Sequence, residues 1–180
     1  MSDVNEFKKY MLDLNIDDNI TQYIMDMLEG ENDFNSIILK FEILNHEGIN
    51  VNTIQDEIVE NPFFLTCEPK EFEKNIEILK KYVDSNEIAN VIEMNPEYLT
   101  IQKDYFEQNI KMLKIILSEE NFEFLLKGNG EIFTFNSDYL EKRLEFFIKN
   151  GLKDKLETLI VERIDLFEAD EDEIDFDEIV

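Results

Sequence analysis

The chain has 180 residues, of which 43% are apolar, so it is long enough to bury a hydrophobic core without disulfides. Its 43 acidic and 17 basic residues give a formal net charge of −26, which opposes binding to phosphate backbones and to anionic lipid. The single cysteine excludes an intramolecular disulfide, and no apolar stretch approaches the roughly 20 residues that a membrane-spanning helix needs. We therefore expect a soluble, cytoplasmic protein without membrane contact.

The N-terminal segment predicts two helices. Apolar residues at Phe7, Met11 and Leu14 recur at helical spacing, and a second apolar set of the same kind follows a polar break. Gly30 ends the second helix. We therefore predict an N-terminal helical cap over residues 1–30.

An internal repeat with a period of 34 residues follows this cap. Thr66, Thr100 and Thr134 share the period, and each ends a similar short segment. Apolar sets in register come after each threonine: Phe72, Ile76, Leu79; Phe106, Ile110, Leu113; Leu140, Leu144, Phe147. Self-similarity at this period is typical of stacked helical units that bury their apolar faces against their neighbours. The sequence therefore predicts an all-α solenoid, right- or left-handed, with about four helix-turn-helix repeats over residues 31–167.

Proline and glycine mark the ends of the predicted long helices. Pro69 stands where a helix begins, a position at which its missing N–H costs no hydrogen bond. Gly48 and Gly151 follow long-helix patterns and suit the left-handed conformation that closes many helices. We expect helix boundaries at these three residues.

Residues 62–65 (Pro-Phe-Phe-Leu) and residues 96–99 (Pro-Glu-Tyr-Leu) each separate a short helix from a longer one with a Phe-x-x-x-Ile-x-x-Leu pattern. This arrangement, from Phe34 to Phe167, resembles the helical repeats of the mitochondrial transcription termination factor family. The resemblance implies the repeat fold. Members of that family are basic and bind duplex DNA, whereas this chain is acidic, so we expect no direct nucleic-acid binding. A tetratricopeptide array shares the period, but its small packing residues are missing.

Residues suited to catalysis are scarce. His46 is the only histidine and Cys67 is the only cysteine, and nothing in the sequence pairs them. We expect Cys67 to be a packed small hydrophobe rather than a reactive thiol. Pairs of carboxylates arise by chance in so acidic a chain, so they do not indicate a hydrolase. We predict a non-enzymatic protein without catalytic residues, metal site or cofactor.

Two acidic features are candidate binding surfaces. The first is a set of glutamates at equivalent positions of three repeats, which we expect to form a row on one side of the array. The second is the C-terminal segment 168–180, which predicts a mobile acidic tail whose spaced apolar residues suit a basic groove. The predicted partner-binding residues are Glu73, Glu107, Glu141, Asp170, Glu171, Asp172, Glu173, Asp175, Phe176, Asp177 and Glu178.

These features favour an acidic protein-binding module. Rows of carboxylates can replace phosphates, and electrostatic attraction speeds association with a basic cleft. We therefore predict a nucleic-acid mimic, an inhibitor of the anti-restriction or anti-CRISPR type, whose partner is a basic nucleic-acid-binding protein or nuclease. Two alternatives stay open: a termination-factor-like regulator that binds nucleic acid through a local basic strip, and a general acidic adaptor or antitoxin. The oligomeric state is also open.

Overall fold

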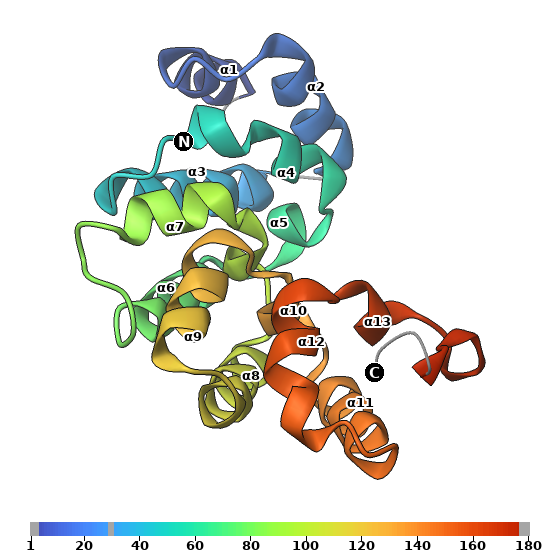
Figure 1. Cartoon of the computed structure of the whole chain (residues 1–180). Coiled ribbons are helices and arrows are strands. Elements are labelled where there is room, and N and C mark those ends of the chain that lie inside the picture. The colour runs from blue at the N-terminus through green and yellow to red at the C-terminus, as the bar shows by residue number, and fades with distance from the viewer. Residues whose placement is uncertain (1–3, 29–30, 177–180) are drawn as a thin grey trace. The chain divides into compact units, whose positions relative to one another are not determined.

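The described chain is helical throughout. The computed structural model describes residues 4–28 and 31–176, and none of these residues lies in a β-strand. The chain divides into two compact units, Met1–Lys103 and Asp104–Val180, whose elements appear in chain order from blue to red in Figure 1. The prediction of an all-α repeat fold is confirmed, while the number of repeats and the handedness stay predictions. No helix in the described residues is long and apolar enough to cross a membrane.

The first unit begins with the two helices of the predicted cap and continues with two sets of a long, a short and a very short helix. Its elements are α1 (Val4–Asp13), α2 (Asp18–Met27), α3 (Glu31–His46), the 3-10 helix η1 (Val51–Ile54), α4 (Gln55–Glu60), α5 (Phe63–Thr66), α6 (Pro69–Leu79), α7 (Ile88–Met94) and η2 (Pro96–Leu99).

The second unit repeats the same order of elements. They are α8 (Lys103–Ile116), which starts at the unit boundary, α9 (Glu119–Gly128), α10 (Glu131–Thr134), α11 (Ser137–Lys149), η3 (Lys153–Lys155), α12 (Leu156–Glu162), α13 (Asp165–Glu168) and η4 (Glu171–Glu173). The short segments that separate the repeats are very short helices of four residues each: α5, η2, α10 and α13.

Three helices, α1, α3 and α11, end in the same left-handed turn. Gly48 and Gly151 have φ values of 77° and 83°, as predicted, and Asn15 has a φ of 56°. The backbone N–H that follows the turn donates a hydrogen bond to a carbonyl of the helix. For example, Ile49 N lies 2.9 Å from Leu44 O. The same bond follows the turns at the other two residues, and α1 therefore ends as a long helix of the array does. At the other end of a long helix, proline occupies the predicted first position of α6.

The apolar sets in register form the core. All nine of their side chains are buried, with exposed fractions of at most 6%. Aromatic rings from the very short helices pack onto the long helices, as in the pairs Phe64–Phe72 at 5.0 Å and Phe147–Phe167 at 5.1 Å between ring centroids. Edge-to-face and tilted ring pairs of this kind add to the stabilisation from apolar burial. The hydrophobic periodicity therefore predicts the core correctly.

Four long helices also each bury a polar side chain with N–H donors, which the sequence analysis missed. These side chains are Lys40 on α3, Asn75 on α6, Asn109 on α8 and Arg143 on α11, and each is at most 4% exposed. Each stands directly before the middle member of the apolar set of its helix, so together they follow the repeat period. Buried polar groups are costly unless they form hydrogen bonds, so these four require partners.

In the first unit, the partners are the carbonyls at the ends of α5 and η2. Lys40 Nζ donates to Phe64 O and to Leu65 O, at 2.8 Å in both cases. Asn75 Nδ2 donates to Leu99 O at 3.3 Å and to the carbonyl two residues further on at 2.8 Å. Each long helix is thus tied to the very short helix that closes its own repeat.

The second unit has the same arrangement. Asn109 Nδ2 donates to Phe133 O at 3.0 Å and to Phe135 O at 2.6 Å. The guanidinium of Arg143 donates to Leu166 O and to Ala169 O, with 3.1 Å between Nε and Leu166 O. Lysine, asparagine and arginine therefore perform one structural task, because all three donate N–H groups.

Adjacent short helices are linked by another repeated hydrogen bond. The backbone N–H of the residue that caps one short helix donates to a side-chain oxygen on the short helix of the following repeat. The pairs are Asp17 N with Gln55 Oε1 at 2.9 Å, Asn50 N with Glu93 Oε1 at 2.7 Å and Ser118 N with Glu157 Oε1 at 2.6 Å. Hydrogen bonds from Ser118 and Asn121 lower the pKa of Glu157.

Replacing one buried donor measures its contribution. We expect Asn109→Leu to lower the free energy of unfolding by about 2–4 kcal/mol, because a buried and a partly buried carbonyl lose their donor. Gln108→Leu, at an exposed position of the same helix, is the matched control and changes stability by less than about 0.5 kcal/mol. Urea unfolding followed by circular dichroism gives both values, and equal values for the two variants contradict the assigned role.

Lys40 makes the free energy of unfolding depend on pH. Its burial lowers the pKa below the usual 10.5, and the charges of Cys67 and Glu68 oppose this effect only in part. Between the lowered pKa and 10.5, the unfolded chain binds a proton that folded Lys40 lacks, so the free energy of unfolding rises with pH. We expect this rise to disappear in Lys40→Met and to persist in Lys111→Met, whose lysine is exposed. Chemical denaturation from neutral pH upward tests it, and an unchanged rise in Lys40→Met contradicts it.

Candidate functional site

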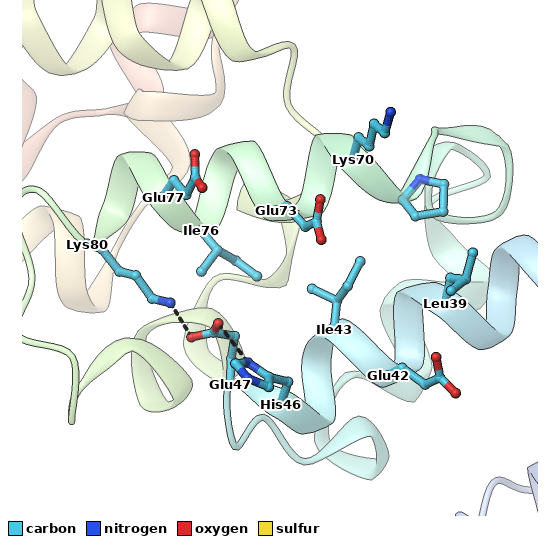
Figure 2. A pocket seen from close by; sticks show the side chains of 11 residues that line it. Leu39, Glu42, Ile43, His46, Glu47, Lys70, Glu73, Ile76, Glu77 and Lys80 are labelled. Atoms are coloured by element: carbon cyan, nitrogen blue, oxygen red, sulfur yellow. Dashed lines mark hydrogen bonds and ion pairs between the residues drawn. The ribbon is translucent and has the colours of Figure 1, made fainter.

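A groove of about 650 Å³ lies between the long helices α3 and α6 of the first unit (Figure 2). Leu39 and Ile43 of α3 and Ile76 of α6 form its apolar floor. Ile76 is almost completely buried, Ile43 is half-buried, and Leu39 keeps 50% of its surface exposed. Leu39 and Ile43 lie outside the core set of their helix, which is Ile37, Phe41 and Leu44.

Charged side chains rim this floor. They are Glu42, Glu47, Glu73, Glu77, Lys70, Lys80 and the ring of His46. Carboxylates outnumber lysines by four to two among these residues, so the groove is acidic on balance. Of these residues, the sequence analysis singled out only Glu73 for a binding role. The second apolar stripe of α3 is the signal in the sequence that could have identified the groove.

Glu47 connects the ends of the two helices that form the groove. Its carboxylate lies 2.6 Å from Lys80 Nζ and 3.3 Å from His46 Nδ1. Burial raises the pKa of Glu47, but hydrogen bonds and charges from Lys80 and His46 outweigh this effect, so the pKa is lower than usual. Glu47 is therefore ionised at neutral pH, and its ion pair joins α3 to α6 (Figure 2).

The residues that line the groove include few groups suited to catalysis. Its lining includes no serine, threonine, cysteine or tyrosine that could act as a nucleophile beside the exposed His46. The other candidate for catalysis, Cys67, is half-buried, and burial raises the pKa of its thiol. Within residues 4–28 and 31–176, no three of His, Cys, Asp and Glu are placed to hold a metal ion.

The three glutamates of the predicted row stand at equivalent positions of three long helices. Glu73 on α6 and Glu141 on α11 are exposed, whereas Glu107 on α8 is half-buried. Each directly follows a buried core residue of its helix. The structure places Glu73 in the α3–α6 groove. The use of all three as one binding surface stays a prediction.

The predicted acidic tail is described as far as residue 176. Asp170, Glu171, Asp172, Glu173 and Asp175 are exposed. The apolar side chains between them are engaged: Ile174 is buried, and the ring of Phe176 lies 5.6 Å from that of Phe146 on α11. Asp177 and Glu178 lie outside the described residues. A partner-binding role of the tail stays a prediction, and Phe176 would have to leave Phe146 in order to contribute its whole ring.

Many cations of the chain are paired with carboxylates. Lys74 lies 2.6 Å from Glu71, and Lys80 forms the ion pair of the groove. Further pairs are Lys127 with Glu123, Lys149 with Glu145 and Arg163 with Asp165. Lys40 and Arg143 are buried in the repeats. These paired and buried basic side chains are not available for an anionic ligand.

Comparison with known proteins identifies the family. The model of the mTERF family matches residues 19–161, from the start of α2 to the end of α12, and this range includes all four long helices with buried donors. No curated protein and no solved structure matched the chain. The family match covers well over half of the chain and confirms the resemblance noted in the sequence. The chain therefore belongs to the mTERF family.

Proposed function

We propose that this chain is a nucleic-acid-binding regulator of the termination-factor type. The observation that carries the proposal is the family match over residues 19–161. It favours the alternative that the sequence analysis placed behind the nucleic-acid mimic, and it lends the inhibitor no support.

The charge of the chain limits how it can bind nucleic acid. A net charge of −26 repels phosphates, so binding depends on a few exposed cations. Lys70, Lys111 and Lys142 are exposed, one on each of α6, α8 and α11, and they form no ion pair within the described residues. Each is a candidate phosphate contact of its own unit, Lys70 of the first and Lys111 and Lys142 of the second.

Three contacts predict weak binding with a small salt dependence. We expect duplex DNA to bind at low salt, with a slope of about −3 in a plot of log K against log salt concentration. Lys70→Ala/Lys111→Ala/Lys142→Ala should abolish this binding, because it removes the proposed phosphate contacts. Lys74→Ala is the matched control, since the ammonium of Lys74 is already paired with Glu71. Fluorescence anisotropy with labelled DNA and RNA at several salt concentrations measures both, and absence of binding at every salt concentration rejects the proposal.

A second candidate function is an acidic protein-binding module for a basic partner. Two observations favour it: the net charge of the chain, and an acidic groove with an apolar floor. Complementary charge would speed association with such a partner and select against acidic ones. The two functions are compatible, because a regulator that binds weakly to nucleic acid can be recruited by another protein.

A further inference from the structure

We propose that the α3–α6 groove binds a basic amphipathic helix of another protein. This inference deepens the second candidate function, on which it rests, and it is independent of nucleic-acid binding. Helices that dock in grooves insert apolar side chains at positions i, i+3 or i+4, and i+7, while polar residues line the edges. The groove offers a matching surface in both respects.

The apolar floor runs along the direction of the helices. Leu39 and Ile43 are four residues apart, so they lie on one face of α3, and Ile76 faces them from α6 (Figure 2). Leu39 keeps 50% of its surface exposed, whereas its neighbours on the other face of α3 are buried in the core. A docked apolar stripe would cover Leu39 and Ile43 together, and the removal of this surface from water would stabilise the complex.

The rim determines the charge of the occupant. Glu42 on α3 and Glu73 and Glu77 on α6 are exposed, and the last two are four residues apart on one face of their helix. Lys80 neutralises Glu47, which leaves three exposed carboxylates against Lys70. Lysine or arginine residues that flank the apolar stripe of a partner helix would complement this rim.

The same charges exclude other occupants. Carboxylates on both walls repel nucleic acid and anionic membranes. A second copy of this chain would bring together two molecules that each carry a net charge of −26. A helix of opposite charge with an apolar stripe is the occupant that satisfies both the floor and the rim.

Two contacts connect the elements that form the groove. The ion pair of Glu47 with Lys80 connects the two helices at one end, and the buried donor Lys40 anchors α3 to the segment that precedes α6. Preorganisation of this kind lowers the entropy that binding costs.

A labelled model peptide tests the proposal with the full chain. The probe is a helical peptide of about 14 residues, with leucines at i, i+4, i+7 and i+11 and lysines beside them. In the control peptide, glutamate replaces each lysine. We expect the basic peptide to bind with increasing affinity as salt is lowered, and the acidic peptide not to bind. Fluorescence anisotropy gives the affinities, and hydrogen exchange should show protection of α3 and α6.

Variants of the groove separate this site from general attraction between opposite charges. Glu73→Gln/Glu77→Gln should weaken peptide binding about threefold to tenfold, and Leu39→Ser about fivefold. Glu119→Gln/Glu120→Gln is the matched control, because it also removes two exposed carboxylates, from α9 and outside the groove. It should leave the affinity unchanged. None of these variants should weaken DNA binding, because none removes a cation.

The outcomes distinguish two kinds of failure. If the basic peptide binds but Glu119→Gln/Glu120→Gln weakens it as much as the groove variants do, binding to basic partners stands and the groove proposal is wrong. If the basic peptide does not bind at about 1 mM, both the groove proposal and the second candidate function are rejected. Equal binding of the acidic peptide also overturns the proposal.

Discussion

The hydrogen bond from a buried side chain to the carbonyls of a very short helix is the interaction on which each repeat depends. A helix of four residues leaves its backbone groups without partners of their own, since the first four N–H groups and the last four C=O groups of any helix lack them. Inside a packed array, such carbonyls cannot rely on water. Lys40 provides donors for two carbonyls of α5. Asn75, Asn109 and Arg143 each provide donors for one carbonyl of a very short helix and for one carbonyl just beyond its end. One side chain thereby closes each repeat.

Once these hydrogen bonds close the repeats, the long helices pack side by side, and this packing creates the candidate functional surface. In the first unit, α3 and α6 enclose an acidic groove whose floor is apolar. The same packing makes some basic side chains unavailable to a ligand, because Lys40 is buried in a repeat and Lys80 pairs with Glu47 across the groove. A chain with few basic residues thus uses several of them internally. The charge of the chain therefore opposes the nucleic-acid binding that we propose, and recruitment by a basic protein would reconcile the two.

The sequence analysis succeeded where the signal lies within one helix. The period of the apolar sets predicted the core, and Gly48, Gly151 and Pro69 predicted helix ends, because apolar spacing and backbone conformation are local properties. It missed the turn at Asn15, since asparagine adopts a positive φ less regularly than glycine does. It also missed the buried donors, because lysine, asparagine and arginine share no hydropathy signal.

By itself, the sequence determined the helical period, the core, the family and the acidic charge, all of which follow from composition and from regular spacing along the chain. Only the tertiary structure decided which polar side chains are buried and which carboxylates share a groove. The reason is that these properties depend on partners that are distant in the chain. The buried donors contact carbonyls 23–26 residues away, and the groove joins residues of two separate helices. Spacing within one helix cannot identify such partners.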